Sequence, residues 1–495
     1  MTTPLVSVIM PMYNMEPYLK EAVDSVLVSD YPSLELVLMD DGSSDDSLLI
    51  AQEYAVHDPR VQVHTQTNAG ACAARNHAIA LAKGKYILPV DADDRIDKCF
   101  ISEAVARMES DNELKVVYSH AEFFGDRAGE WKLLPFSLSL LARKNMIPIT
   151  ALFRREDWEQ AGGYCQEIIA REDWEFWIAI LKNGGKVIQL PQSMLYYRVR
   201  ANSKRISDRA LKRHVIDVLN RRHPEFFEQQ LGGKLHYNRT WSKLLNRLSR
   251  IIFPRRIVVN PQWKELELFI RTLPVHFRNE GIPLYKGRNE LKEFREQGYE
   301  LVVKSFRIPN IFNQLAYNLF RPSKARRSYR YAERLRKAGV GSPQPIGFYS
   351  TGTWLMFGHS YYVSLKSTCP YTYRGFATRD FSRKDDILRA IARTTARMHE
   401  QGFLHKDYSA GNILFEERAD GTIHVEIIDL NRMRFGRVSM EKGCKNFERL
   451  PGTPAMFKVL ADEYARVRGF DAHACLRLIE KAHAADPKTD KRIKK

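Results

Sequence analysis

The stretch Lys85-Tyr-Ile-Leu-Pro-Val-Asp-Ala-Asp-Asp94 is a short apolar run that ends in three carboxylates, those of Asp91, Asp93 and Asp94. A short apolar run bounded by turn signals is typical of a buried strand. Ligands of open α/β sheets bind beyond the carboxyl ends of such strands, so we expect these carboxylates to face a ligand. Asp-x-Asp at a strand end suits a divalent cation that holds a diphosphate, since such cations bind carboxylates and substrate phosphates. An isolated Asp-Ala-Asp is also compatible with a solvated acidic turn.

Three more apolar runs precede this stretch, at Val6 to Met10, Leu34 to Met39 and Val61 to Thr65. Helical patterns separate them, and each run ends in a polar or acidic turn. Strands that alternate with helices predict a parallel, doubly wound sheet. The polar turns then lie together on one rim of the sheet, where a ligand would bind.

The length and charge of the chain limit its class. Its 495 residues are too many for one ordinary core and predict two or more domains. Lys and Arg outnumber Asp and Glu by 77 to 59, which gives a formal net charge of +18. Such a balance favours polyanionic partners, namely nucleic acid, an anionic membrane face or phosphorylated substrates. No nucleic-acid motif accompanies the charge, so we expect no nucleic-acid partner.

The cysteines and the hydropathy pattern indicate the compartment. The six cysteines lie far apart without a Cys-x-x-Cys pair, as in a reduced cytosolic chain. The N-terminus enters a strand pattern almost at once, which leaves no room for a signal peptide. No stretch approaches the ~20 apolar residues that a membrane span needs. We therefore expect a cytoplasmic protein, whose membrane contact is at most peripheral, on the inner face of the inner membrane.

Four motifs in the first half resemble those of a family-2 glycosyltransferase of the GT-A fold, over roughly residues 4 to 205. They are Pro11-x-Tyr13-Asn14, Asp40-Asp41-Gly42-Ser43, Asn68-x-Gly70 with Arg75-Asn76, and Asp91-Ala-Asp93-Asp94. The resemblance implies that a nucleotide sugar, such as a UDP-sugar, contacts Pro11, Tyr13, Asn14, Asp40, Asp41, Arg75 and Asp91. It also implies that Asp93 binds Mg²⁺ or Mn²⁺. Such a metal would offset the charge that develops on the nucleotide diphosphate leaving group.

The general base of this reaction is expected further along the chain. Arg171-Glu-Asp-Trp-Glu-Phe-Trp177 begins a helix, and the resemblance maps the base onto Asp173. A carboxylate within hydrogen-bond reach of an acceptor hydroxyl can take its proton as the new C–O bond forms. The alternative is that Glu172 and Asp173 only stabilise the helix through its dipole. The stretch from Phe123 to Asn145 carries no assignable pattern.

Residues 206–280 form a basic stretch that predicts a helical linker without strands. An apolar stripe at helical spacing comprises Trp241, Leu244, Leu245, Leu248, Ile251 and Ile252, with Lys243, Arg247 and Arg250 on other faces. A basic amphipathic helix with Trp can lie in a membrane interface. Such a stripe can equally pack on its own protein, and the sequence leaves both possibilities open.

A second set of motifs begins with Phe403-Leu-His-Lys-Asp-Tyr-Ser-Ala-Gly-Asn-Ile-Leu-Phe415, followed by a strand that runs into Asp429. His-x-Asp, then Asn, then an Asp after a strand is the order of the kinase catalytic loop and metal-binding Asp. Asp407 would orient or deprotonate the attacking hydroxyl, while Asn412 and Asp429 would hold Mg²⁺ (or Mn²⁺) against the ATP phosphates. Upstream, Lys304 in a strand pattern would contact the phosphates, and Glu333 would be its ion-pair partner or part of a surface pair.

This half resembles the lipopolysaccharide kinase family, which phosphorylates Kdo or heptose of the lipid A inner core, over roughly residues 281 to 470. No Gly-x-Gly-x-x-Gly precedes the lysine, and Asp429-Leu-Asn-Arg432 stands where protein kinases have Asp-Phe-Gly. No Ala-Pro-Glu segment follows, which argues against a protein substrate. The resemblance implies an α+β, protein-kinase-like domain.

These observations predict a glycosyltransferase domain at 1–205, a linker at 206–280 and a kinase-like domain at 281–495. We expect a bifunctional enzyme of surface-glycan assembly that transfers a sugar to a lipid-linked acceptor and phosphorylates a core sugar such as Kdo. The acceptor would be lipid A-core or another lipid-linked glycan, held near an anionic membrane. Two alternatives remain: a C-terminal pseudokinase that serves as a binding module, or a kinase for a protein or small molecule.

Overall fold

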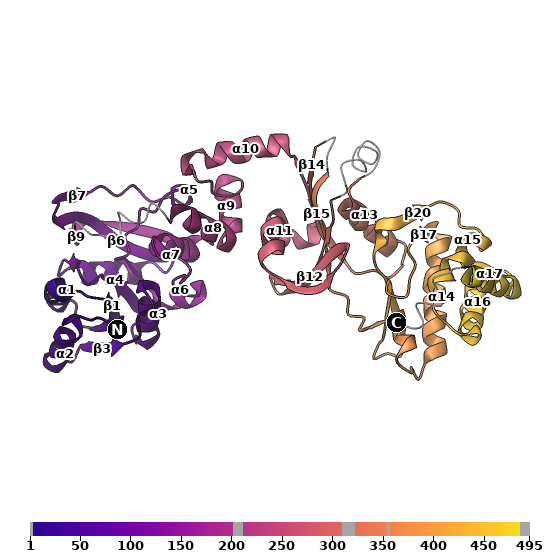
Figure 1. Ribbon diagram of the computed structural model, residues 1–495, viewed down its shortest axis with the longest axis horizontal. Helices are drawn as coiled ribbons and strands as arrows, with labels where there is room; N and C mark the ends of the chain where they lie inside the picture. The colour runs from indigo at the N-terminus through magenta and orange to yellow at the C-terminus, as the bar shows by residue number, and fades with distance from the viewer. Residues whose placement is uncertain (1–2, 201–210, 309–321, 354–356, 486–495) are drawn as a thin grey trace. The chain divides into compact units, whose positions relative to one another are not determined.

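The computed structural model describes residues 3–200, 211–308, 322–353 and 357–485, and the chain divides into two compact units (Figure 1). The first unit is Met1–Leu248 and the second is Ser249–Lys495. The division therefore falls inside the expected linker at 206–280, whose helices and strand are shared between the units. The expected boundary at 205 lies outside the described residues.

A nine-stranded sheet forms the centre of the first unit, in the order β3-β2-β1-β4-β8-β6-β9-β5, with β7 paired to β6. Its strands are β1 (Val6–Met12), β2 (Leu34–Asp40), β3 (Val61–Thr65), β4 (Tyr86–Pro89), β5 (Arg95–Ile96), β6 (Leu114–Gly125), β7 (Gly129–Trp131), β8 (Leu152–Arg154) and β9 (Lys186–Val199). Strands β3, β2, β1 and β4 are parallel, as expected. Beyond β4 the sheet is mixed, because β8 runs antiparallel to both β4 and β6.

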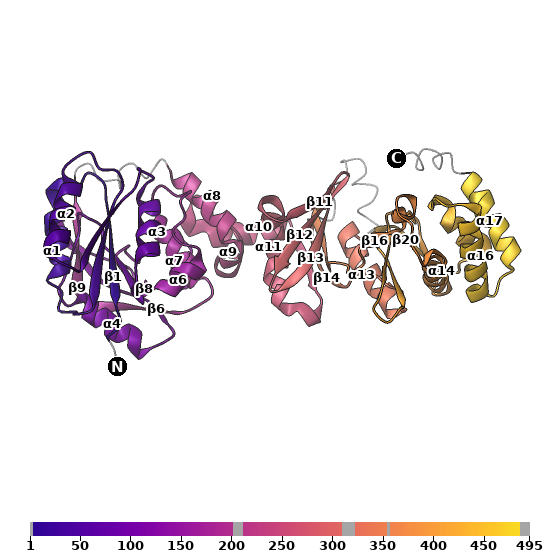
Figure 2. The same cartoon turned by 90° about the horizontal axis from the view of Figure 1, so that it is seen from below.

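Helices cover both faces of this sheet, with α1 and α2 on one side and α3, α6 and α7 on the other (Figure 2). The helices are α1 (Glu16–Leu27), α2 (Ser47–His57), α3 (Ala71–Leu81), α4 (Phe100–Ser110), α5 (Leu138–Leu141), α6 (Arg155–Ala161), α7 (Glu172–Leu181), α8 (Lys212–Arg222), α9 (Pro224–Leu231) and α10 (Ser242–Ile252). Val8 and Met10 of β1 pack in one hydrophobic core and Ile9 in the other. Since successive side chains of a strand point to opposite faces, a strand buried on both faces is apolar throughout.

The second unit begins with an antiparallel six-stranded sheet in the order β10-β14-β15-β13-β12-β11. Its strands are β10 (Arg255–Val259), β11 (Ile282–Lys286), β12 (Asn289–Glu296), β13 (Tyr299–Phe306), β14 (Pro345–Gly352) and β15 (Phe357–Leu365), with helices α11 (Glu267–Asn279) and α13 (Lys324–Lys337). Strand β10 was not expected, because its basic residues mask a two-residue alternation. Arg256 and Val258 are exposed, whereas Ile257 packs against the core between α11 and the sheet.

The rest of the second unit is mainly helical, with α14 (Lys384–Glu400), α15 (Met440–Lys445), α16 (Pro454–Arg468) and α17 (Ala472–Ala484). Its small sheets are β16-β18-β19 and β17-β20, whose strands are β16 (Tyr371–Thr372), β17 (Phe403–His405), β18 (Ile413–Glu417), β19 (Ile423–Ile427) and β20 (Met433–Phe435). A sheet lobe followed by a helical lobe, each with its own hydrophobic core, confirms the expected α+β architecture.

Two structural findings concern the cysteines and the membrane-spanning segments. All six cysteines are free thiols. Within the described ranges, no helix combines the length and the apolar character needed to cross a bilayer.

Candidate functional site

The ends of the parallel strands β1 and β2 are joined by backbone-to-side-chain hydrogen bonds. Asn14 follows β1 with a left-handed backbone (φ 52°), and its N–H donates to Ser43 Oγ at 3.0 Å. The N–H of Ser44 in turn donates to Asn14 Oδ1 at 2.8 Å. Pro11 lies within β1, and Tyr13, the residue before Asn14, is 47% exposed. These three predicted nucleotide-binding residues therefore lie at one rim of the sheet.

Asp40 and Asp41 are nearly fully buried and shape the neighbouring turns. Asp40 Oδ1 accepts a hydrogen bond from the N–H of Ser43 at 3.1 Å. Asp41 accepts from the N–H groups of Ala69 and Gly70, both at 2.9 Å. The two carboxylates thus hold the Asp-Asp-Gly-Ser turn and the Asn-x-Gly turn in place at the rim.

Arg75 connects the acidic end of β4 to the start of α7. Its guanidinium is buried, with Nη2 at 2.7 Å from Asp91 and Nη1 at 2.8 Å from Glu172. Burial alone would lower the pKa of Arg75, but the charges of Asp91 and Glu172 raise it well above its usual value. The arginine therefore stays charged and links two motifs that lie far apart in the sequence.

Asp93 and Asp94 form an acidic cluster with Asp91 at the end of β4. Asp93 pairs with Arg200 at 2.8 Å, and Asp94 accepts from the N–H of Arg198 at 2.8 Å. Asp94 Oδ2 is buried without a hydrogen-bond partner among the described residues. Burial, followed by the negative charge of the neighbouring carboxylates, raises the pKa of Asp93 and Asp94. Crowded carboxylates with an unsatisfied oxygen are chemically suited to Mg²⁺ or Mn²⁺.

A cavity of about 430 Å³ lies beside this cluster, and Asp173 is part of its wall. Asp173 Oδ2 accepts from Asn145 Nδ2 at 2.7 Å, and Oδ1 accepts from the N–H of Trp174 at 2.8 Å. Burial, reinforced by the charge of Glu172, raises the pKa of Asp173 to about 7. A general base works best when its pKa lies near the operating pH. Asp173 has the properties of such a base.

The cavity brings together three of the predicted site residues, Arg75, Asp91 and Asp173. Its wall also contains Asp94, Trp131, Lys132, Asn145, Arg171, Glu172, Trp174, Tyr197 and Arg239. Sequence reasoning assigned no role to Asn145 or to Arg200, the partner of Asp93. Asn145 ends an irregular stretch without periodicity, and Arg200 follows the last strand of the sheet, so neither carried a signal.

The predicted phosphate-binding lysine of the second unit lies on β13. Lys304 Nζ is 2.7 Å from Asp429 Oδ1, and Asp429 has a left-handed backbone (φ 58°). The predicted pair between Lys304 and Glu333 is not formed in the described part of the chain. Glu333 instead accepts from the hydroxyl of Tyr329 at 3.0 Å, because both residues lie on α13 one turn apart.

The predicted catalytic loop is fixed by backbone and side-chain contacts. Buried His405 accepts from the N–H of Asp407 at Nδ1 (3.1 Å) and donates from Nε2 to the carbonyl of Ile428 (3.1 Å). Burial lowers the pKa of His405, so the ring is neutral, as these two roles require. Asn412 Nδ2 donates to the carbonyl of Asp407 at 2.8 Å. The loop therefore joins Asp407 to Asn412 and to the residue before Asp429.

Two arginines hold the carboxylate of Asp407. Arg449 Nη1 is 2.7 Å from Oδ1, and Arg432 Nη1 is 3.5 Å from Oδ2. Neither arginine was assigned a role from the sequence. Arg432 ends the Asp429-Leu-Asn-Arg432 motif, in which only Asp429 was given a role, and Arg449 lies outside the motifs. Their guanidinium groups place positive charge beside the carboxylate that would accept the proton of the acceptor hydroxyl.

Comparison with protein families assigns the two halves separately. Residues 7–174 match Glycosyl transferase family 2, and residues 308–453 match the Lipopolysaccharide kinase (Kdo/WaaP) family. The first match contains the rim motifs together with Asp173. The second contains Glu333, Asp407, Asn412, Asp429 and Arg449, while Lys304 lies just before it.

Individual relatives resemble the first half. The uncharacterized glycosyltransferase EpsJ of Bacillus subtilis is 31% identical over 218 residues, which cover 40% of this chain and 62% of EpsJ. The putative teichuronic acid biosynthesis glycosyltransferase TuaG of the same organism is 33% identical over 208 residues, covering 40% of this chain and 81% of TuaG. The chain thus spans less than two thirds of the length of EpsJ.

A solved structure of WaaP in complex with acyl carrier protein also resembles the chain. It shares 18% identity and a TM-score of 0.36, covering 48% of this chain and 99% of WaaP.

Proposed function

The chain belongs to glycosyl transferase family 2 through its first half, and from this premise we propose that the first unit transfers a sugar from a nucleotide sugar to a hydroxyl of a lipid-linked acceptor. The observation that carries the proposal is Asp173, a carboxyl with a pKa of about 7 in the wall of a cavity that also contains Asp91. Asp173 takes the proton of the acceptor hydroxyl as that oxygen attacks the anomeric carbon. The configuration at that carbon is inverted, as expected for the family.

The nucleotide sugar, for example a UDP-sugar, is proposed to lie across the rim. Its base and ribose contact the turns that follow β1 and β2, and its diphosphate lies near the acidic cluster. The proposed contacts are Pro11, Tyr13, Asn14, Asp40, Asp41, Arg75 and Asp91. Asp93 is the proposed ligand for Mg²⁺ or Mn²⁺, which would supply charge neutralisation of the leaving diphosphate. The crowded carboxylates and the unsatisfied oxygen of Asp94 support a cation at this position.

For the second unit we propose phosphoryl transfer from ATP to a sugar hydroxyl. Lys304 contacts the ATP phosphates, while Asn412 and Asp429 are the proposed ligands for Mg²⁺ or Mn²⁺. Asp407 accepts the proton of the attacking hydroxyl. Glu333 would join this set only if Lys304 left Asp429 and paired with Glu333 when ATP binds.

The chemistry around Asp407 also limits the acceptor. Arg432 and Arg449 lie within ion-pair distance of this carboxylate, so an acceptor with its own carboxylate or phosphate would meet two guanidinium groups. The acidic sugar Kdo of a lipid A core satisfies this condition. A pseudokinase would bind such a glycan without turning over ATP.

Helix α10 supports the proposal that the enzyme works at an anionic membrane. Its polar side packs on the first unit, since Asn246 Nδ2 donates to the carbonyls of Leu231 (3.2 Å) and Lys234 (2.9 Å). Ser242 is fully buried on the same side. The apolar side faces outward: Leu244, Leu245, Leu248, Ile251 and Ile252 are all exposed, as are Trp241 and Phe253, which flank the helix. A helix that packs through its polar residues leaves its apolar face for another medium, such as the bilayer interface.

The basic residues of α10 select the kind of membrane. Arg247 and Arg250 lie on the helix, and Arg255 and Arg256 follow it closely. Basic residues near an apolar face favour anionic lipid headgroups. Wild-type protein is expected to co-sediment with vesicles of anionic lipid more strongly than with zwitterionic vesicles.

Two charge substitutions separate this helix from general surface hydrophobicity. Ile251→Glu, at a side chain 69% exposed on α10, should weaken sedimentation with anionic vesicles. Val56→Glu, at an apolar side chain 82% exposed on α2, is the matched control and should sediment like wild type. Equal sedimentation of both variants with wild type would contradict membrane binding through α10.

Sugar transfer is tested by measuring nucleotide release from a panel of nucleotide sugars in the presence of lipid-linked acceptors. Wild type should release nucleotide from at least one donor, and Asp173→Asn should reduce the acceptor-dependent rate by at least about 100-fold, because general-base catalysis contributes factors of that order. Unchanged transfer by Asp173→Asn would contradict the assignment of the base.

A further inference from the structure

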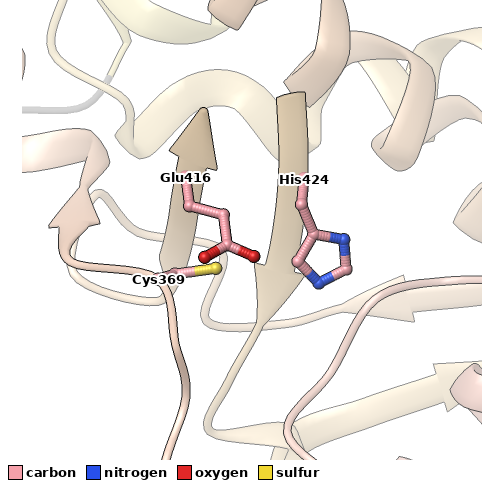
Figure 3. A group of neighbouring side chains, drawn as sticks. All are labelled: Cys369, Glu416 and His424. Atoms are coloured by element: carbon pink, nitrogen blue, oxygen red, sulfur yellow. The ribbon is translucent and has the colours of Figure 1, made fainter. Parts of the chain in front are cut away.

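A group of side chains in the second unit lies outside the residues proposed for phosphoryl transfer. Cys369 belongs to the connector, residues 366–370, between β15 of the six-stranded sheet and β16 of the three-stranded sheet. Glu416 on β18 and His424 on β19 are direct cross-strand neighbours. One potential ligand atom from each of these three side chains lies within 4.8 Å of the other two (Figure 3).

The chemistry of this group differs from that of an ordinary ion pair. A thiol, a carboxylate and an imidazole are three of the side chains that bind Zn²⁺. In a tetrahedral zinc site, with bonds of about 2.0–2.3 Å, neighbouring ligand atoms lie about 3.5 Å apart. The ligand atoms of the group lie no more than 4.8 Å apart, so their largest separation exceeds that geometry by at most about 1.3 Å, which side-chain rotations can supply. Glu426 Oε1, 3.6 Å from His424 Nε2, adds a second carboxylate beside the group but is not one of its three ligands.

The electrostatic environment favours a cation at this position. Cys369 is 7% exposed, and burial raises the pKa of its thiol to about 12, so the group is neutral without a metal. The facing charges are the carboxylates of Glu416 and Glu426 and the guanidinium of Arg418, whose Nε is 3.3 Å from Glu416. Two carboxylates against one guanidinium leave a net negative charge in a largely buried space. A divalent cation would compensate it.

The position of the group suggests what such a cation would do. The β18–β19 hairpin begins directly after Asn412 and ends at Ile427, two residues before Asp429. Glu416 and His424 therefore lie on the hairpin whose other end carries both proposed metal ligands of the phosphotransfer site. Cys369 lies on the connector between the two sheets. A metal bound to all three would fix the connector against this hairpin.

We propose that Cys369, Glu416 and His424 form a Zn²⁺ site that fixes the connector between the two sheets to the β18–β19 hairpin. Zn²⁺ replaces the proton of the Cys369 thiol, and that proton is released to solvent, so binding weakens as the pH falls. The metal is structural and takes no part in either transfer reaction. Zn²⁺ binding at this group therefore does not depend on either proposed activity.

The test uses the full chain, stripped of metal with a chelator and reloaded with Zn²⁺ or Co²⁺. Wild type should retain one Zn²⁺ per chain after desalting, and the Co²⁺ form should show the near-ultraviolet charge-transfer band of a cobalt thiolate. Cys369→Ser should lose the band and the bound Zn²⁺. The carboxylate sites proposed near Asp93 and Asp429 cannot produce this band, because they contain no thiolate.

Two further variants separate metal binding from folding. Cys475→Ser replaces a fully buried thiol of the same unit outside the group and should keep the band. Glu416→Gln retains the thiol and the side-chain shape but should bind Zn²⁺ at least tenfold more weakly. Added Zn²⁺ should raise the melting temperature of wild type and not that of Cys369→Ser. No thiolate band in wild type, or a band that persists in Cys369→Ser, would overturn the proposal.

Discussion

The hydrogen bond from Asn145 to Asp173 allows the assignment of the general base to be tested through pH. The Asn145 side chain stabilises the charged form of the carboxylate from 2.7 Å, and so lowers a pKa that burial has raised to about 7. Hydrogen bonds to charged groups contribute about 1.5–3 kcal/mol. One pKa unit corresponds to about 1.36 kcal/mol. Because Asp173 is partly open to cavity water, we take the lower value and expect Asn145→Ala to raise the pKa by about one unit.

This shift gives a specific pattern of rates. Only the deprotonated carboxylate acts as a base, so kcat/KM should fall below pH 7 in wild type and below about pH 8 in Asn145→Ala. The variant should be about eightfold slower than wild type at pH 6.5 and nearly equal to it at pH 9, from the fractions deprotonated at each pH. The assay is acceptor-dependent nucleotide release at saturating donor and low acceptor concentration.

A matched control and a refuting result complete this test. Gln62→Ala removes another amide-to-carboxylate hydrogen bond of 2.8 Å, to Glu35, away from the cavity. Its acidic limb should coincide with that of wild type. An equal loss of rate for Asn145→Ala at every pH would show that Asn145 only supports the local structure. It would also remove the pH argument for Asp173 as the base.

Three further predictions concern stability, metal and acceptor. The Asp173 carboxyl has a higher pKa in the folded chain than in the unfolded one (about 7 against about 3.9), so it destabilises the fold increasingly as the pH rises between these values, by up to about 4 kcal/mol. Asp173→Asn should therefore be more stable than wild type, by a larger difference in melting temperature at pH 8 than at pH 5. An equal difference at both pH values would contradict this prediction. Chelation of divalent metal should abolish sugar transfer, and Asp93→Asn should reduce it at least about 100-fold at saturating Mn²⁺, because a bound cation supplies several kcal/mol of charge stabilisation; full activity in the variant would exclude Asp93 as a ligand. Arg449→Ala should raise KM for an anionic sugar acceptor about tenfold, equivalent to about 1.4 kcal/mol, without changing KM for ATP. The control Arg466→Ala removes an arginine paired with Glu463 on the surface of α16 and should change neither KM. A parallel rise in both KM values for Arg449→Ala would mean that Arg449 does not recognise the acceptor.

The sequence predicted those parts of the fold that depend on local patterns. Apolar runs identified β1, β2, β3 and β4, and their polar ends were correctly expected on one rim, since parallel strands end together. The exposed and buried residues of β10 alternate within a basic stretch, so the pattern was hidden by charge. The mixed half of the sheet was not expected, because strands such as β8 are only three residues long and carry little periodicity.

The candidate sites were predictable where motifs carry them and not where pairing depends on tertiary structure. Asp173 and Asp407 were found from their motifs, and their roles remain predictions. The contacts of Asn145 and Arg449 with these carboxylates span 28 and 42 residues, respectively, and no local pattern encodes them. Glu333 was predicted to pair with Lys304 but accepts a hydrogen bond from Tyr329. Tyr329 lies one turn away on the same helix, so its hydroxyl reaches Glu333 without any rearrangement of the chain.

The measurement that tests the two-activity account most directly is the transfer of labelled γ-phosphate from ATP to purified Kdo-lipid A. Wild type and Asp93→Asn should incorporate label equally, since Asp93 belongs to the first unit. Asp407→Asn should incorporate none. If wild type incorporates no label, with or without added nucleotide sugars, the second unit is a binding module and the account of a bifunctional enzyme is wrong.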